Sequence, residues 1–231
     1  MLKRLLALLI TLALPFLLVV SSIRLVANDW FIHFEYNTRP GFPADPYGFT
    51  LEERTRLAMD GLYSVLPQGE GLIRLQQARL SDGSLAFNER EIKHMQDVRV
   101  LMSLVFPIQL IGLALIVILG IVLHRFTPWR RAVPTGLKWG AILTLTLLAV
   151  LIGYILINFD AFFLTFHQMF FAGDTFLFLY TDTLIRLYPE MLWSDASILI
   201  GVLTVIMAVV LLVISGAWLK RVENNAARSV V

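Results

Sequence analysis

FNEREIKHMQDVRVL, residues Phe87 to Leu101, is the stretch that decides the fold of this chain. A polar loop passes here into a helix that continues directly as an apolar run. Asn88 and Glu91 form a capping box, which predicts that the helix starts at this point. If the helix is unbroken, His94 lies about 9 Å above the hydrocarbon of a membrane. An ionisable ring would then stand level with a lipid headgroup or ester.

The composition is typical of a membrane protein. Of the 231 residues, 58% are hydrophobic and 16% are charged, and the mean hydropathy is +0.75. These values are too apolar for an ordinary soluble domain. The formal net charge is +2 and no basic run suits nucleic acid, so we expect no nucleic-acid partner. The chain has no cysteine, which excludes disulfides, thiolate metal sites and an acyl-cysteine intermediate.

Four apolar stretches are long enough to cross a membrane as helices. They cover about residues 5–26, 100–123, 139–157 and 197–219. Pro15 and Pro107 predict kinks in the first two stretches. The first stretch is longer than a usual signal-peptide core and has no clear cleavage site, so we expect a retained helix. The predicted fold class is a mainly α integral membrane protein, in which residues 1–231 form a single membrane domain.

Two polar segments separate these spans. Residues 28–98 are expected to form a small α+β segment. It would contain a short strand or aromatic belt at Trp30–Tyr36, an amphipathic helix from Leu51 to about Leu66, and a short hairpin around Ser81–Gly83. Residues 158–196 begin with FDAFFLTFHQMFF, in which six of thirteen residues are Phe. This composition favours a Phe-rich helical loop between the third and fourth spans.

The distribution of charge predicts the orientation in the membrane. Residues 1–4, 124–138 and 220–231 hold nine Lys and Arg residues against a single acid, Glu223. Residues 28–98 and 158–196 hold sixteen of the seventeen acids and eight bases. Cytoplasmic loops of membrane proteins carry an excess of Lys and Arg. We therefore expect both termini in the cytoplasm and both polar segments outside it.

Two of the four histidines are candidates for chemistry. His94 has Glu91 one turn before it and Asp97 about one turn after it. A carboxylate beside an imidazole can orient the ring and stabilise its cation, as a general base requires. An ordinary Glu and His pair on a helix surface gives the same pattern.

The second candidate, His167, lies in the Phe-rich segment and is followed seven residues later by Asp174. The rings around it belong to Phe163, Phe166, Phe170 and Phe171. Such a segment can pack as core, lie in the membrane interface, or line a slot for acyl chains. Both histidines are expected on the same outer side near the membrane, where they either share a site or serve separate structural roles.

The motifs FNEREIKHMQDV and FHQMFFAGDTF, with a Pro-Glu further on, resemble the four-span bacterial membrane family that includes the lipoprotein intramolecular transacylase. The order of spans and loops agrees over most of the chain, and one departure is Phe176, where Trp is expected. The resemblance implies a plasma-membrane acyltransferase that moves the sn-2 acyl chain of a diacylglyceryl-lipoprotein to the α-amino group of its N-terminal cysteine. It also implies that His94 and His167 are catalytic, by general acid/base catalysis without a covalent enzyme intermediate, a metal ion or another cofactor.

Under this interpretation the acids Glu91, Asp97 and Asp174 orient the two rings. Asn88 and Arg99 are secondary candidates, for capping and for contact with a headgroup or oxyanion. The partners would be the lipoprotein substrate and membrane lipid, and the oligomeric state is not predicted.

Two alternatives remain at this point. One is a metal-dependent membrane lipid hydrolase whose ligands are His94, His167 and either Asp174 or Glu91. The other is a non-enzymatic accessory or transport protein whose outer segment binds a partner. Few charges lie within the spans, which argues against an ion or proton path.

Overall fold

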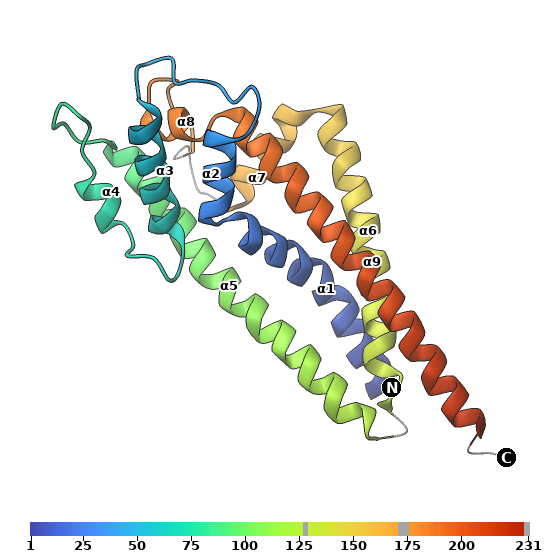
Figure 1. Cartoon of the computed structure of the whole chain (residues 1–231). Helices are drawn as coiled ribbons and strands as arrows, with labels where there is room; N and C mark the ends of the chain where they lie inside the picture. The colour runs from blue at the N-terminus through green and yellow to red at the C-terminus, as the bar shows by residue number, and fades with distance from the viewer. Residues whose placement is uncertain (127–128, 171–175, 229–231) are drawn as a thin grey trace. The chain divides into compact units, whose positions relative to one another are not determined.

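The computed structural model describes residues 1–126, 129–170 and 176–228, and this part of the chain is mainly helical with almost no strand (Figure 1). In this part of the chain, four helices are long and apolar enough to cross a membrane: α1 (Leu2–Val26), α5 (Glu89–His124), α6 (Ala132–Ile157) and α9 (Glu190–Arg228). Each predicted span lies inside one of them. Pro15 and Pro107 are contained within α1 and α5 and end neither helix. The mainly α membrane fold is therefore confirmed.

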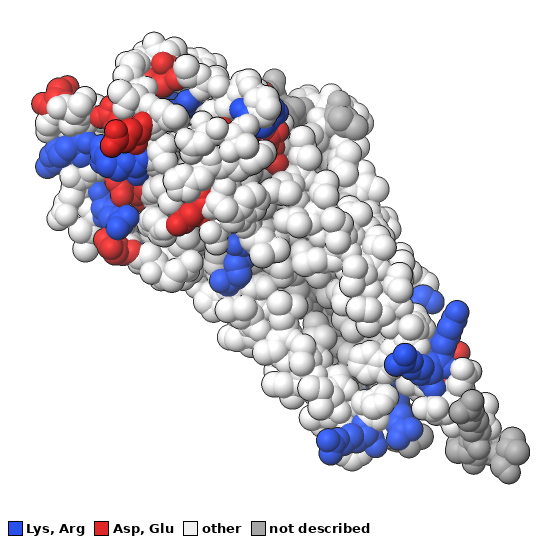
Figure 2. Space-filling view, in the orientation of Figure 1, with Lys and Arg blue, Asp and Glu red and all other residues white. Residues whose placement is uncertain are grey.

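The chain divides into two compact units. Unit 1 comprises residues 1–23, 107–157 and 199–231, and unit 2 comprises residues 24–106 and 158–198. Unit 1 has a single acid, Glu223, which forms an ion pair with Arg131. On the face drawn in Figure 2, acidic and basic side chains intermingle over the short helices of unit 2, whereas the charges shown on unit 1 are nearly all basic and gather at the end where the termini lie. The division by charge that the sequence suggested thus coincides with the division into units.

In unit 1, α6 approaches α1 closely through two glycines. Gly136 and Gly140 lie one turn apart on α6. A Cβ atom at Gly136 would lie 2.7 Å from Cβ of Ile10, and one at Gly140 would lie 2.8 Å from Cβ of Leu14. The surrounding buried cluster consists of Ile10, Leu14, Leu18, Val133, Leu137, Ala141 and Ala208. Small residues at this spacing allow membrane helices to pack by close backbone contact.

Buried polar side chains in unit 1 bond across helices. The hydroxyls of Ser22 on α1 and Thr204 on α9 form a hydrogen bond of 2.8 Å. Nε2 of Gln109 on α5 donates to Oγ of Ser21 on α1 at 2.7 Å. Because hydrocarbon contains no water, such groups must satisfy one another. These bonds therefore help to define how the helices of unit 1 pack together.

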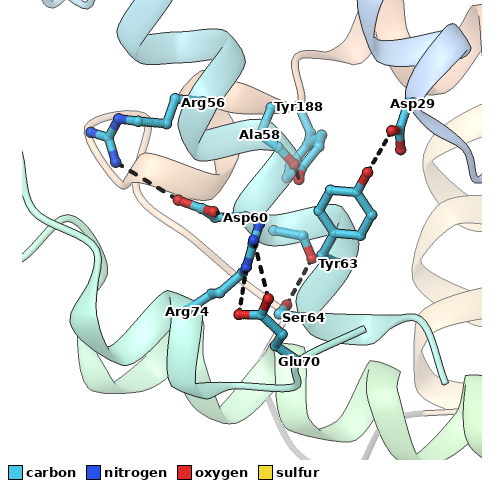
Figure 3. A network of polar contacts seen from close by, with 10 residues as sticks. Asp29, Arg56, Ala58, Asp60, Tyr63, Ser64, Glu70, Arg74 and Tyr188 are labelled. Atoms are coloured by element: carbon cyan, nitrogen blue, oxygen red, sulfur yellow. Dashed lines mark hydrogen bonds and ion pairs between the residues drawn. The ribbon is translucent and has the colours of Figure 1, made fainter. Parts of the chain in front are cut away.

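Unit 2 contains the short helices α2 (Asp29–Asn37), α3 (Leu51–Val65), α4 (Ile73–Gln77), α7 (Phe159–Phe170) and α8 (Thr183–Leu187). α3 packs against α2, α4 and α8, which lie beside it in Figure 1. Arg54 on α3 donates from Nε and Nη2 to the carbonyl oxygen of Arg186 on α8, at 3.1 and 2.8 Å. The hydroxyl of Tyr188 donates to the carbonyl oxygen of Ala58 at 2.7 Å (Figure 3). The amphipathic helix expected from Leu51 is therefore the centre of this unit.

Two β features were expected from the sequence, and the structure differs from both predictions. The prediction of a strand at Trp30–Tyr36 is wrong, because this stretch lies in α2. The buried residues of α2 are Phe31, Ile32, Glu35 and Tyr36, whose spacing is that of one helix face. The expected hairpin is reduced, in the described residues, to a single bridge between Arg79 and Leu85, with Gly83 at φ +85° in the turn. Without a third strand to pair with, so short a hairpin does not extend.

Candidate functional site

The capping box predicted from the sequence is present at the start of α5. Oδ1 of Asn88 accepts the Glu91 backbone N–H at 3.0 Å, and Oε2 of Glu91 accepts the Asn88 backbone N–H at 2.8 Å. Oε1 of Glu91 accepts the backbone N–H of Leu184 on α8 at 2.6 Å. Glu91 is buried, and burial raises the pKa of its carboxyl. We expected Glu91 to orient the ring of His94, whereas its carboxylate bonds to backbone donors and fastens α8 to the start of α5.

His94 follows on α5, before the apolar run that begins at Val100. The helix has 36 residues, a length of about 54 Å, whereas about 20 residues suffice to cross the hydrocarbon. The turn that carries His94 thus lies outside the expected span. Its half-buried ring meets the ring of Phe178 edge-on, with centroids 5.3 Å apart. Burial and the charge of His167 lower the pKa of His94 from 6.5 to about 4, and Asp97 opposes this shift.

His167 lies near the end of α7, between two aromatic rings. The ring of Phe176 stacks on it with centroids 5.0 Å apart and an interplanar angle of 29°. Phe166 meets it edge-on at 5.5 Å. Phe176 is buried and covers one face of the imidazole. The family pattern led us to expect Trp at position 176. Phe176 likewise presents an aromatic face to the imidazole.

One short segment contacts both histidines. Phe176 stacks on His167 and Phe178, two residues later, meets His94. These two residues belong to a segment without regular structure between α7 and α8, and their rings reach imidazoles on two different helices. The segment is fastened to α5, because Nη1 of Arg90 donates to the carbonyl oxygen of Leu177 at 3.2 Å. Two imidazoles from α5 and α7 are therefore brought together, near enough for the charge of one to act on the other.

Sequence reasoning missed this contact segment. Phe178 was not among the predicted residues, and Phe176 was noted only as a departure from a pattern. The signal that would have found them is the alternation of Phe in the sequence FLF at residues 176–178. Period-two spacing outside a helix indicates side chains that share one side.

The remaining predicted polar residues occupy different places around the site. Asp97 is near enough for its charge to raise the pKa of His94. Arg99 donates from Nη1 to the carbonyl oxygens of Ser64 and Leu66, at 2.8 and 3.0 Å. Five residues along a helix correspond to a rotation of about 140°. Arg99 therefore lies on a different side of α5 from His94.

The predicted acyl-chain lining is only partly described. Phe166 and Phe170 lie on α7, with exposed fractions of 44% and 45% and centroids 5.1 Å apart. Their rings form an accessible apolar surface. Phe171, Asp174 and the side chain of Phe163 lie outside the described residues. The metal-site alternative that used Asp174 is untested for the same reason.

Comparisons with known proteins identify related chains. The family model described as lipoprotein intramolecular transacylase Lit matches residues 8–193. A protein of Aquifex aeolicus, described as uncharacterized, is 33% identical over 210 residues, which are 91% of this chain and 93% of that protein.

Solved structures with a similar fold come from Bacillus cereus. The membrane integral lipoprotein intramolecular transacylase of that organism matches with a TM-score of 0.76 at 21% identity, over 95% of this chain and 97% of that chain. A variant of that enzyme with a histidine replaced by arginine matches with a TM-score of 0.73 at 21% identity, over 97% of this chain and 95% of that chain. At this level of identity the likeness is one of fold.

Proposed function

The chain belongs to the lipoprotein intramolecular transacylase family, and we propose that it moves the sn-2 acyl chain of a diacylglyceryl-lipoprotein to the α-amino group of the same N-terminal cysteine. Its partners are then the lipoprotein substrate and membrane lipid. Such a substrate contains both its own nucleophile and its own ester. The protein need not form a covalent intermediate, which agrees with the absence of cysteine.

The observation that carries this proposal is the pair of imidazoles in unit 2, one of which is uncharged at neutral pH. The pKa of His94 is lowered to about 4, in part by the charge of His167. Like charges close together disfavour the doubly protonated pair. The pair thus has one proton acceptor, and a second ring able to donate. Transfer of an acyl group from oxygen to nitrogen requires one acceptor and one donor.

In this mechanism His94 is the acceptor. The free α-amine, whose pKa is about 7.7 to 8.0, attacks the ester carbonyl carbon and forms the C–N bond. Its proton passes to a ring nitrogen of His94. The bond from the carbonyl carbon to the sn-2 oxygen then breaks, and that oxygen takes a proton from His167. Return of the proton from His94 to His167 restores both rings, so that the net change is one proton moved from nitrogen to oxygen.

Positioning supplies a large part of the rate enhancement. Orienting an amine against an ester of the same molecule can contribute on the order of 7 kcal/mol. Phe176 and Phe178 would restrain the two rings, and the exposed faces of Phe166 and Phe170 offer an apolar surface for acyl chains. Phe163 and Phe171, the other two residues of the predicted lining, belong to the same proposal.

We assign the reaction to the extracytoplasmic face of a bacterial plasma membrane. The support for this orientation is the excess of Lys and Arg in residues 1–4, 124–138 and 220–231, which we take to be cytoplasmic. The two histidines belong to the opposite set of segments, residues 28–98 and 158–196. Both termini are cytoplasmic in this arrangement.

Mass spectrometry of N-terminal lipopeptides tests the proposal, after expression in a bacterium that leaves lipoproteins with free N-termini. Transfer leaves the total mass unchanged and moves one acyl chain from ester to amide. We expect His94→Ala and His167→Ala each to reduce product formation by about 10²- to 10⁴-fold, the usual contribution of a general acid or base. His33→Ala, which removes an exposed histidine on α2, is the control and should retain activity.

Two results would contradict this proposal. Full product from either variant of the histidine pair would disprove the paired mechanism. No product from the wild-type chain in several hosts would disprove the transacylase function.

A further inference from the structure

Within unit 2, α5 has a second feature on the side away from His94. A groove of about 620 Å³ lies between α5 and the segment that contains α4. Its polar lining consists of Gln76, Gln96, Arg99 and Ser103. The three of these on α5 lie about 140° to 200° around the helix from His94. The volume is in the range of small-molecule sites, and the groove is separate from the histidine pair.

Arg99 is the single charged residue that lines this groove. Its Nη1 donates to the carbonyl oxygens of Ser64 and Leu66, which hold the guanidinium in place. No ion pair among the described residues includes Arg99. Gly71, at φ +78°, lies beside the guanidinium: a Cβ there would be in ordinary van der Waals contact, 3.4 Å from Cζ and 3.6 Å from Nε and Nη2 of Arg99. The hydrogen bonds that Arg99 forms among the described residues use Nη1, which leaves Nε and Nη2 as donors for an anion.

Two acidic side chains on α3 and in the loop before α4 bond to another arginine. Asp60 and Glu70 both bond to Arg74, at 3.3 and 2.9 Å, and Figure 3 shows the guanidinium of Arg74 between the two carboxylates. The carboxylate of Asp97 on α5 raises the pKa of His94 on the same helix. The residues that line the groove include no acid, so the charge of its lining is that of Arg99.

An exposed apolar surface adjoins this cation. Ile73, Val100 and Leu104 line the groove and are 58%, 65% and 58% exposed. Val100 and Leu104 lie in the first turns of the apolar run of α5. A guanidinium beside the start of an apolar surface suits a molecule with a phosphate group joined to hydrocarbon.

We propose that this groove binds a bilayer glycerophospholipid. Its phosphodiester accepts hydrogen bonds from Nε and Nη2 of Arg99 and from the side-chain amides of Gln76 and Gln96. One acyl chain lies along Ile73, Val100 and Leu104. A diacylglyceryl-cysteine has no phosphodiester, so this ligand differs from the substrate of the proposed reaction. The groove can therefore bind this lipid whether or not the chain transfers an acyl group.

Native mass spectrometry of the full-length protein tests this site without any turnover. The detergent-purified protein is incubated with phosphatidylglycerol, or with diacylglycerol that has the same acyl chains and no phosphate. We expect the wild type to retain one phosphatidylglycerol and to release diacylglycerol.

Two variants locate the bound lipid. Gln96→Glu adds a negative charge to the groove and leaves the bonds of Arg99 to the two carbonyl oxygens intact. It should reduce retention of phosphatidylglycerol about fivefold, the effect expected of about one charge near a membrane surface. Gln77→Glu makes the same change at an exposed residue of α4 that lies outside the groove. This variant should retain phosphatidylglycerol as the wild type does.

The proposal is overturned by several outcomes. Equal retention of both lipids would mean that the apolar surface alone binds. Undiminished retention by Gln96→Glu, or an equal loss in Gln77→Glu, would mean that the lipid binds elsewhere. Displacement of phosphatidylglycerol by millimolar inorganic phosphate would make this a site for free phosphate.

Discussion

His94 differs from an exposed histidine because burial and a neighbouring charge act on it in the same direction. Both disfavour its cation, and the pKa falls to about 4. An imidazole with an ordinary pKa would be partly protonated at neutral pH and so partly unable to accept a proton. The environment of His94 therefore keeps the ring neutral at rest. It also disfavours the imidazolium formed when the ring accepts a proton, which favours prompt release of that proton to His167.

We expect His94 to titrate near pH 4 in the folded protein, measured by NMR of protein with ¹⁵N-labelled histidine. Asp97→Asn should lower the midpoint further, because the Asp97 carboxylate favours the cation. His167→Ala should raise it, because a repelling charge is removed. A midpoint near 6.5 that neither substitution moves would contradict this account of the site.

Glu35 on α2 is a second buried titratable group, outside the histidine pair. Its side chain is fully buried, and neither carboxylate oxygen has a hydrogen-bond partner among the described residues. Burial, and to a smaller extent the charge of Asp195, raise the pKa of Glu35 to about 7. Arg39 opposes the shift, but its Nε is bonded to Asp195 at 2.5 Å.

This carboxyl predicts a pH dependence of stability. The unfolded chain releases the proton of Glu35 near pH 4.5 and the folded chain near 7. Between these values the folded state binds more protons, so its stability falls as the pH rises through this window. Glu35→Gln should flatten the decline of the apparent Tm between pH 5 and 7.5, followed by thermal unfolding in detergent. Glu52→Gln, which changes an exposed acid on α3, should keep the wild-type slope, and an unchanged slope in Glu35→Gln would refute the assignment.

Among the helices, the contact of α6 with α1 depends on the absence of side chains at two positions. Cβ of Ile10 lies 2.7 Å from where a Cβ of residue 136 would be, and the carbonyl oxygen of Ala7 lies 2.8 Å away. Neither atom belongs to the flexible end of a side chain. An added methyl group therefore has to separate the helices.

Gly136→Ala should destabilise the protein by about 1–3 kcal/mol, the usual cost of overpacking. Gly153→Ala is the matched control on the same helix, because no atom lies within 4 Å of its would-be Cβ. That change should be neutral or slightly stabilising, since alanine favours a helix over glycine. Thermal unfolding of the purified proteins in detergent measures both. Equal stability of the two variants would contradict close packing at Gly136.

The segment at residues 176–178 shows how an element without regular structure can define a site. The two imidazoles belong to different helices, and neither helix determines the distance between them. The rings of Phe176 and Phe178 contact one imidazole each, and the backbone between them is bonded to α5. Precise positioning of catalytic groups commonly depends on such supporting contacts.

For the whole molecule, the orientation in the membrane is open to a direct test. The chain has no cysteine, so single cysteines can be introduced without background. Ser81→Cys lies in the exposed turn of unit 2 and Asn225→Cys lies near the end of α9. A membrane-impermeant maleimide should label Ser81→Cys in intact spheroplasts and Asn225→Cys only after permeabilisation. The same labelling pattern for both, or the reverse one, would contradict the proposed topology.

Much of the fold was predictable because its causes lie close together in the sequence. An apolar run of about 20 residues forms a helix in a membrane whatever it packs against. The cap at Asn88 involves residues three apart, and it is present as predicted. The contrast between basic and acidic segments can also be counted along the chain. Local patterns were likewise sufficient to select His94 and His167 as candidates.

Other properties depend on residues that are distant in the sequence. Trp30–Tyr36 forms a helix because its buried face packs in unit 2, although its aromatic composition also suited a strand. Glu91 bonds to Leu184, and Phe176 and Phe178 contact histidines on two different helices. The lowered pKa of His94 follows from burial and from a ring seventy-three residues away. Such contacts and charges act through space, so they arise when the chain folds and leave no pattern in the sequence around His94.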